Sequence, residues 1–212
     1  MNIQKAFSNY SEVPISRNLM LEILKEYKSP NDKISELVKK GILISLRRGL
    51  YITGTDLELP QPNSFLIANH LRGPSYVSLE TALSYWGLIP ERVYEIASVT
   101  LKNTIEYNTP VGRFSFHYAP SPYYSFGIKS IKLSDKQKVL VATKEKAICD
   151  KIIFTKGLTL RSTKQVKEFL MEDLRIERGE LKKLNAELIE LWIENAPKKS
   201  SIIKLIKTLK ML

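Results

Sequence analysis

Two acidic residues in a lysine-rich stretch, Glu145 and Asp150 of KEKAICDKIIF, are the main candidates for catalytic carboxylates. Carboxylates near lysines could hold a divalent metal ion for nucleic-acid hydrolysis. Their spacing argues against this chemistry, because residues five apart lie on different faces of a helix. The adjacent Glu145 and Lys146 also lack the acid-x-lysine spacing of restriction-type nucleases. We therefore expect a buried or capping role for Asp150, a solvent-exposed Glu145 and no catalytic site.

Cysteine and histidine offer no further reactive centre. The sole cysteine, Cys149, cannot form an intrachain disulfide or a multi-cysteine zinc site. The two histidines, His70 and His117, are far apart and stand in no metal-binding spacing. Glycine-rich phosphate loops and nucleophile motifs are missing from the sequence as well. The sequence thus predicts no metal site and no cofactor, and we expect a protein that is not an enzyme.

Basic side chains point to a different chemistry, the binding of polyanions. The 212 residues include 33 lysines and arginines against 22 acidic residues, which gives a net charge of +11. This balance favours nucleic acid or an anionic membrane surface as a partner. No apolar run approaches the roughly 18 residues of a membrane span, and the first residues contain no apolar signal segment. We therefore expect a cytoplasmic protein.

The first basic region has the pattern of two helices followed by a hairpin. A helix over 16–27 carries one apolar stripe, and SPNDKISELVKKG over 29–41 has a serine N-cap, proline at the first helical position and a final glycine. GILISLRRGLYIT over 41–53 is typical of two strands joined at Arg47-Arg48-Gly49. Two closely joined helices and a hairpin predict a winged helix-turn-helix domain over residues 1–54.

The second helix would be the recognition helix, and its outward side is mixed in charge. We expect DNA contacts from its polar residues and from the hairpin turn, namely Lys33, Ser35, Lys39, Lys40, Arg47 and Arg48. The same side carries Asp32 and Glu36, which phosphate repels unless they accept from cytosine amino groups or pair with neighbouring lysines. The two arginines have no core role and should be free to reach phosphate, so anchoring through the hairpin is the firmer expectation.

Beyond a proline-containing linker at 55–63, the pattern changes. Helices are expected at 64–71 and 79–85, and strands at 93–100, 114–118, 127–133 and 139–142. From residue 144 onward the pattern is helical, with stripes such as Leu181, Leu184, Leu188 and Leu191. The expected fold class is α+β: the winged helix, a mixed α+β domain over 63–155 and a helical C-terminal extension over 156–212. The last, basic amphipathic helix should dock onto this domain, with a partner or a membrane surface as alternatives.

Four segments carry a resemblance to a known family: LRRGLYIT at 46–53, SYVSLETALSYWGLIPERVYEIASVT at 75–100, FSFHYA at 114–119 and KEKAICDKIIF at 144–154. Together they resemble the AbiEi antitoxins, transcriptional regulators of bacterial type IV toxin–antitoxin systems that act in abortive infection of phage-infected cells. The resemblance covers roughly residues 1–155. It implies an N-terminal winged helix and a C-terminal antitoxin domain.

The resemblance also implies a function and partners. The protein would repress its own operon by binding repeats in double-stranded operator DNA, where two copies could pair as a homodimer. The DNA-contact role would fall on the six residues named above. Its functional partner would be a nucleotidyltransferase-like toxin, which it counters without a stable complex. Two other interpretations stay open: a protein-interaction module whose winged helix does not bind DNA, and a nucleic-acid-processing enzyme that uses Glu145 or Asp150.

Overall fold

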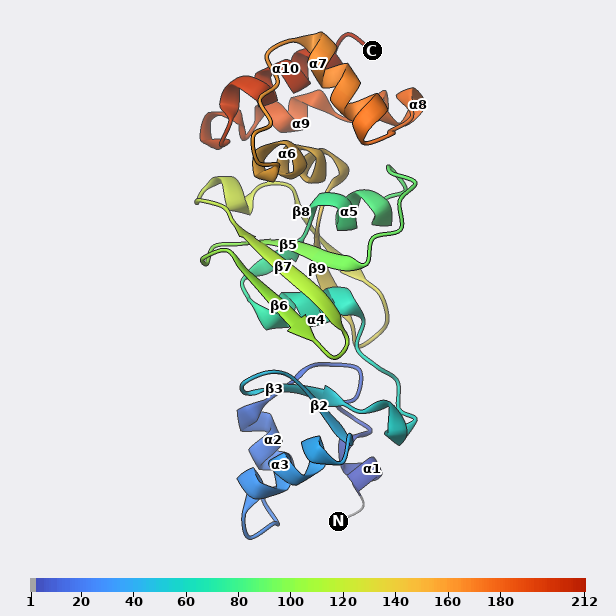
Figure 1. Cartoon of the computed structure of the whole chain (residues 1–212), viewed down its shortest axis with the longest axis vertical. Helices are drawn as coiled ribbons and strands as arrows, with labels where there is room; N and C mark the ends of the chain where they lie inside the picture. The colour runs from blue at the N-terminus through green and yellow to red at the C-terminus, as the bar shows by residue number, and fades with distance from the viewer. Residues whose placement is uncertain (1–2) are drawn as a thin grey trace.

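The computed structural model describes residues 3–212 as an elongated body in three tiers (Figure 1). The first described residues lie at one end of the long axis, and the C-terminus lies at the other. Helices with a small sheet form the N-terminal tier, a six-stranded sheet forms the centre, and a group of helices forms the C-terminal tier. The expected α+β class is confirmed at this level.

The N-terminal unit consists of three helices and a three-stranded antiparallel sheet. Its elements are α1 (Ile3–Phe7), β1 (Ile15–Ser16), α2 (Arg17–Ile23), α3 (Pro30–Lys39), β2 (Leu43–Arg47) and β3 (Leu50–Thr53). The strand order is β1-β3-β2, so the short β1 extends the β2–β3 hairpin. Buried apolar side chains from the helices and the sheet form its core: Phe7, Ile15, Met20, Leu24, Ile34, Leu37 and Leu43.

The helix expected over 16–27 is shorter in the structure. Ser16 caps α2, because its side chain accepts a hydrogen bond from the backbone nitrogen of Leu19 at 3.3 Å. The helix ends at Ile23, and turns occupy the chain before α3. Leu24 and Tyr27 still face inward, so the apolar stripe continues through turns instead of through a regular helix.

The β2–β3 hairpin lies between the N-terminal helices and the central tier. On one face, Leu43 joins the core beneath the helices. On the other face, Leu46, Leu50 and Ile52 belong to the main hydrophobic core, which continues into the central tier. Successive residues of a strand point to opposite faces, so the hairpin contributes to two cores at once. The hairpin is therefore an internal layer of the molecule.

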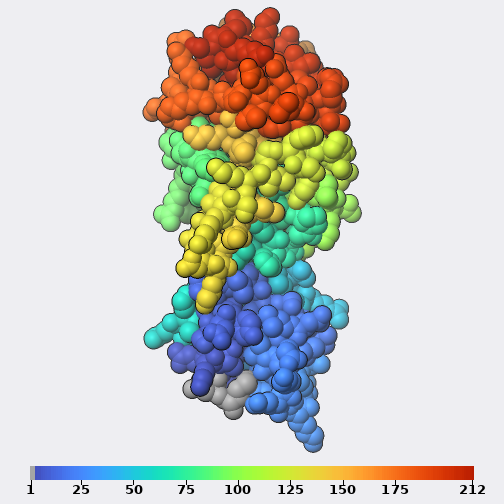
Figure 2. Space-filling view, turned by 180° about the vertical axis from the view of Figure 1, so that it is seen from behind, coloured from blue at the N-terminus to red at the C-terminus, as the bar shows by residue number. Residues whose placement is uncertain are grey.

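Two polar contacts fasten the N-terminal unit to the central tier. The guanidinium Nε of Arg47 donates to the carbonyl oxygen of Leu71 at 3.0 Å. Farther along, the ammonium of Lys136 lies 3.3 Å from a carboxylate oxygen of Glu12. Figure 2 shows the segment that contains Lys136, in yellow, reaching from the central tier to the N-terminal unit. Between the two tiers, the expected linker contains one short 3-10 helix, η1 (Thr55–Leu57).

The central tier is a mixed sheet with the strand order β6-β7-β5-β4-β9-β8. Its strands are β4 (Ser75–Val77), β5 (Glu95–Thr100), β6 (Ile105–Thr109), β7 (Gly112–Tyr118), β8 (Ile128–Lys132) and β9 (Lys138–Ala142). β5 pairs with β7 and β4 with β9 in parallel, and the remaining neighbours are antiparallel. Helices α4 (Ser64–Leu71) and α5 (Leu79–Tyr85) pack against this sheet.

The sequence pattern does not predict β4 or β6. All three residues of β4 are buried, so the strand shows no alternation of apolar and polar residues. β6 forms one edge of the sheet and is largely exposed. Alternation is the main sequence signal of a strand, and it is weak both in fully buried strands and in polar edge strands.

The C-terminal tier is helical, as expected. It contains α6 (Lys144–Phe154), α7 (Thr163–Glu168), the π-helical turn η3 (Phe169–Asp173), α8 (Arg178–Leu181), α9 (Ala186–Glu190), the 3-10 turn η4 (Ile193–Asn195) and α10 (Lys199–Leu209). The predicted docking of the last helix is confirmed, because Ile202, Leu205 and Ile206 are buried while α10 contacts α6, α7 and α9. The other predicted stripe is wrong in its second half, since Leu188 and Leu191 are exposed.

Candidate nucleic-acid interface

Helix α3 carries most of the predicted DNA-contact residues, and its sequence explains where it starts and which face it buries. Pro30 occupies the first helical turn, where a missing backbone N–H costs nothing. Ser29 does not cap the backbone, because its hydroxyl donates to the carboxylate of Asp32 instead. Ile34 and Leu37 are buried against α2 and the sheet. The opposite side faces solvent and divides into two flanks of different charge.

The first flank of α3 is neutralised by local ion pairs. The two carboxylate oxygens of Glu36 lie 2.9 Å from the ammonium of Lys33 and 2.7 Å from that of Lys40. These hydrogen bonds lower the pKa of Glu36, so it stays ionised at neutral pH. The ammonium of Lys33 also lies over the ring of Tyr27, and its side chain is only 17% exposed. Lys33 is therefore not the outward-pointing residue that the helix pattern predicts.

The second flank of α3 carries the exposed carboxylate of Asp32 near its start, and this carboxylate accepts a hydrogen bond from the hydroxyl of Ser29. Asn31, Ser35 and Lys39 are spaced four residues apart, which places them along one side of the helix. All three are exposed. The hydroxyl of Ser35 donates to the carbonyl oxygen of Asn31 at 3.1 Å. Lys39 forms no ion pair with any residue between 3 and 212, so its charge is available to an anion.

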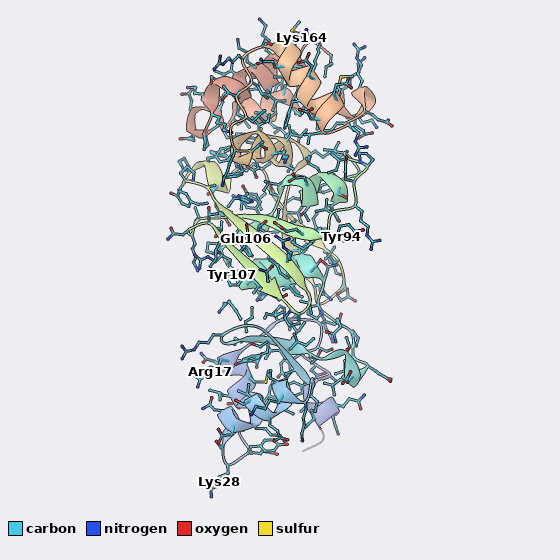
Figure 3. The ribbon with its side chains drawn as sticks, viewed as in Figure 1. Arg17, Lys28, Tyr94, Glu106, Tyr107 and Lys164 are labelled. Atoms are coloured by element: carbon cyan, nitrogen blue, oxygen red, sulfur yellow. The ribbon has the colours of Figure 1, made fainter. Side chains whose placement is uncertain are left out.

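Arg17, the first residue of α2, connects this flank to the hairpin turn. Its guanidinium donates to the side-chain oxygen of Asn31 at 2.8 Å. Its backbone nitrogen donates to the carbonyl oxygen of Gly49 at 2.9 Å. Gly49 has a φ of +80°, which a residue with a side chain rarely adopts, so glycine permits the turn. Figure 3 shows Arg17 at the side of the N-terminal unit.

We call the exposed polar residues that these contacts bring together the basic edge; they are Arg17, Asn31, Ser35, Lys39 and Arg48. Of the six predicted contact residues, three belong to it: Ser35, Lys39 and Arg48. The other three are engaged elsewhere. Lys33 and Lys40 are paired with Glu36, and Arg47 is directed toward the central tier. The expectation that both hairpin arginines are free is wrong for Arg47.

The engagement of Arg47 has a clear cause in the fold. Its Nε donates to Leu71 in the central tier, and one of its terminal nitrogens donates to the backbone oxygen of Arg48 at 3.1 Å. The hairpin is an internal layer, so one of two adjacent arginines at its turn meets the next tier while the other faces solvent. The sequence pattern treats the turn as exposed on both sides and cannot separate the two residues.

Arg17 is a candidate contact residue that the sequence pattern missed, although a signal exists. A basic residue in the first turn of a helix faces the positive end of the helix dipole, which is unfavourable. Arg17 follows the N-cap directly and therefore needs another reason to be basic. Its contacts with Asn31 and Gly49 supply that reason, because they position the guanidinium between the recognition-helix candidate and the hairpin turn.

The acidic pair of α6, the alternative candidate site, does not converge. Asp150 is completely buried and accepts hydrogen bonds from Tyr123 at 2.7 Å, Ser78 at 2.7 Å and Tyr76 at 3.0 Å. Glu145 is half-buried at another face of the helix and accepts from the backbone nitrogen of Asn185. The buried role expected for Asp150 is confirmed, whereas the expected full exposure of Glu145 is wrong.

Lys146 completes the buried polar cluster around Asp150. Its ammonium lies 3.3 Å from the Asp150 carboxylate, donates to the carbonyl oxygen of Tyr123 at 2.9 Å and lies 3.1 Å from the centre of the Tyr123 ring. Burial lowers the pKa of Lys146 while the carboxylate opposes that change. Burial together with Asp150 raises the pKa of Tyr76 and Tyr123. Every charged partner is enclosed, so this cluster is a feature of the core.

Metal-binding clusters and membrane-spanning helices are both missing from the described residues. Among residues 3–212, no three histidine, cysteine or acidic side chains gather in a way that could hold a metal ion. No helix in the same part of the chain has the length and apolar character to cross a membrane.

Comparison with known proteins supports the fold. No family model and no curated protein matches this sequence. Among solved structures, the RV2827C protein of Mycobacterium tuberculosis matches with a TM-score of 0.59 at 12% identity, over 98% of this chain and 75% of that protein. Two Helicobacter pylori proteins, JHP933 and a candidate nucleotidyltransferase, match with TM-scores of 0.32 and 0.33 at 12% identity. Each covers 68% of this chain, and the matched part is 86% of JHP933 and 89% of the other protein. The chain therefore shares its fold with the Mycobacterium tuberculosis protein over nearly its whole length.

Proposed function

We propose that this chain is a DNA-binding transcriptional repressor and antitoxin of the AbiEi type, that it acts in the bacterial cytoplasm and that it is not an enzyme. The observation that carries the proposal is the basic edge, where Arg17, Lys39 and Arg48 lie beside the exposed side of α3 and none of the three is paired with a carboxylate of residues 3–212. The sequence resemblance described above supports the antitoxin part. The order of three helices and a β1-β3-β2 sheet is the order expected of a winged helix-turn-helix, and it supports the choice of α3 as recognition helix.

The contacts in a DNA complex follow from the two flanks of α3. Arg17, Lys39 and Arg48 would bind backbone phosphates, which fixes the position of the helix on the duplex. Asn31 and Ser35, near the N-terminal half of α3, would reach base edges in the major groove. Lys33 and Lys40 would contribute less, because each would have to leave Glu36 first. Two copies on inverted repeats would place their half-sites about 34 Å or a multiple apart.

Salt-dependent DNA binding tests this proposal with a matched pair of adjacent lysines. Full-length protein would be titrated with a duplex from the region upstream of its own gene at several salt concentrations. The comparison is between wild type, Lys39→Ala and Lys40→Ala, both of which remove an exposed lysine from the same turn of α3. Loss of one phosphate contact flattens the slope of log K against log salt by about 0.9. We expect this change for Lys39→Ala and less than half of it for Lys40→Ala.

The opposite results are equally informative. Equal slopes for the two variants would show that α3 does not meet DNA along the flank of Asn31, Ser35 and Lys39. Weak binding of wild type, identical for the upstream duplex and for an unrelated one, would contradict the repressor function. In that case the results would favour the alternative of a protein-interaction module. Stoichiometric recovery of a protein partner at low salt would support that alternative.

The antitoxin part needs a separate measurement. The reading frame next to this gene would be expressed from an inducible promoter, with and without this chain. We expect growth arrest that wild type relieves. Relief that persists in the Lys39→Ala variant would separate antitoxin action from DNA binding. An adjacent frame without toxicity, or toxicity that this chain does not relieve, would contradict the antitoxin assignment.

A further inference from the structure

A polar pocket of about 440 Å³ lies where the N-terminal unit meets the central sheet. Its walls come from three parts of the chain: the end of β2, the end of α4 with the following loop, and the β5–β6 connection with β6. The side chains that matter are Arg47, His70, Arg72, Lys102 and Tyr107. The pocket is separate from the basic edge, which lies on the exposed flank of α3.

Three positive charges line the pocket, and no acidic side chain does. Arg47, Arg72 and Lys102 form no salt bridge with any residue between 3 and 212. The nearest acidic residue in the sequence is Glu106, beside Tyr107 on β6 (Figure 3). Adjacent strand residues point to opposite faces, so Glu106 faces away from the pocket that Tyr107 lines. The pocket therefore has a positive potential that no neighbouring carboxylate cancels.

Arg72 contributes a planar donor group to the pocket. One terminal nitrogen of its guanidinium donates to the carbonyl oxygen of Asn103 at 3.3 Å. Its Nε is buried out of reach of solvent, and no described group accepts a hydrogen bond from it. An anion in the pocket would therefore meet the terminal nitrogens of the guanidinium, whose planar donors suit a phosphate.

The positions of the cations are fixed by the surrounding backbone. Arg47 is held by its hydrogen bond to Leu71. Arg72 and Lys102 lie on two different loops, and Thr100 ties these loops together. Its hydroxyl donates to the carbonyl oxygen of Pro74 at 2.8 Å and accepts a hydrogen bond from the backbone nitrogen of Lys102 at 3.2 Å. Such preorganisation lowers the entropy cost of binding a ligand.

We propose that this junction pocket binds a small phosphate monoester of nucleotide size. The cations recognise the phosphate, and Tyr107, which also lines the pocket, contacts the remainder of the ligand. The volume exceeds what a single phosphate ion fills and falls in the range of small-molecule sites. Partial burial lowers the pKa of His70, so its imidazole is neutral at pH 7 and can accept or donate a hydrogen bond.

A ligand here would also join two tiers of the molecule. Arg47 belongs to the N-terminal unit, whereas Arg72, Lys102 and Tyr107 belong to the central tier. One phosphate bound to both sides would hold the N-terminal unit in a fixed orientation. The pocket is concave, and this shape suits a small ligand. The backbone of a DNA duplex would instead need an open surface or a long groove on the protein.

Isothermal titration calorimetry of the full chain without DNA tests the proposal. The probes are adenosine 5′-monophosphate, ribose 5-phosphate, inorganic phosphate and adenosine. We expect binding of both organic monophosphates, at least tenfold weaker binding of inorganic phosphate, and none of adenosine. The variants are Lys102→Ala, which removes an exposed charge from the pocket, and Arg72→Lys, which keeps the charge but removes Nε. Each should weaken monophosphate binding at least tenfold.

Lys156→Ala is the matched control, because Lys156 is an exposed lysine on a loop outside the pocket. It should leave all affinities unchanged. No monophosphate binding by wild type, equal loss in Lys156→Ala, or equal binding of adenosine would each overturn the proposal. In a separate DNA titration of the same variants, normal monophosphate binding combined with lost affinity for duplex DNA would also overturn it, since the pocket would then serve the DNA backbone. The calorimetry contains no DNA, so its result does not depend on the repressor function.

Discussion

Helices α3 and α6 each contain a lysine and an acidic residue four positions apart that form an ion pair, yet the two pairs have opposite surroundings. In α3, Glu36 and Lys40 are 2.7 Å apart, and their side chains are 41% and 60% exposed. In α6, Lys146 and Asp150 are 3.3 Å apart and fully buried. The same spacing in sequence therefore serves two roles, and burial decides which one.

The difference follows from solvation. An exposed pair is already solvated by water, so its formation contributes little to stability and salt screens it. A buried pair has lost that water, and other groups must replace it. Tyr76, Ser78 and Tyr123 do so for Asp150, and the carbonyl oxygen of Tyr123 does so for Lys146. The α3 pair thus contributes little to stability, while the α6 pair is committed to the fold.

The largest expected effect comes from breaking the buried pair. Asp150→Ala leaves the Lys146 charge and three hydroxyl groups without their partner in the core. We expect a loss of about 3–5 kcal/mol in the free energy of unfolding, measured by urea denaturation. The control is Glu145→Ala in the same helix, which should cost far less because Glu145 is only half-buried. Similar losses for the two variants would show that Asp150 is not central to the core.

A glycine next to the buried pair gives a second, sterically defined test. A Cβ at Gly127 would lie 2.7 Å from the Cβ of Lys146, and its φ is +64°. Gly157 has a similar φ of +72° but open space around its Cβ position. We expect Gly157→Ala to cost about 1 kcal/mol from backbone strain, and Gly127→Ala to cost about 3 kcal/mol because overpacking adds to it. Equal urea midpoints for the two variants would mean that α6 shifts without penalty.

The buried cluster should also make the protein sensitive to alkaline pH. Burial raises the pKa of Cys149 to about 12, and the pKa of Tyr76 and Tyr123 is raised too. These groups ionise more easily in the unfolded chain, so the stability that they contribute is complete below pH 9 and declines above it. The lowered pKa of Lys146 acts in the opposite direction.

At pH 10.5 the thiol alone should cost about 2 kcal/mol relative to pH 8, measured by urea denaturation at the two pH values. Cys149→Ala is the control. It removes the buried thiol, so its urea midpoint should fall less between pH 8 and pH 10.5 than that of wild type. An unchanged pH dependence in this variant would show that the thiol is not responsible.

The smallest effect on stability, and a distinct effect on DNA, is expected from the exposed pair. Glu36→Gln releases both Lys33 and Lys40 and removes a negative charge from α3. The urea midpoint should change little, since the substituted Glu36 side chain is exposed. If the chain binds DNA as proposed, affinity at low salt should rise, and the salt slope should steepen by about 1. A fall in affinity for the upstream duplex would instead show that Glu36 accepts a hydrogen bond from a base.

Much of the local structure could be predicted from the sequence, because local rules govern it. Helix α3 lies where its proline and glycine place it, and Ser16 caps α2 as predicted. The α+β class and the docking of α10 follow from the order of patterns and from the apolar stripe. Strands β4 and β6 could not be predicted, because a fully buried strand and a polar edge strand both lack alternation.

The candidate site was only half predictable, since its residues differ in ways that depend on neighbours remote in sequence. Arg47 and Arg48 are adjacent and chemically identical, yet one binds the carbonyl oxygen of Leu71 and the other faces solvent. Lys39 and Lys40 are also adjacent, and only Lys40 is paired with Glu36. Arg17 became a candidate only when its contacts with Asn31 and Gly49 were known.

The sequence by itself determined the basic character of both ends, the start and end of α3 and the apolar stripes, because each depends on residue types within a few turns. The tertiary structure decided which lysine–acid pair is buried, which hairpin arginine bonds to the central tier and where three cations meet at one pocket. Those outcomes depend on desolvation and on long-range contacts. Both are properties of the assembled chain that no local pattern records.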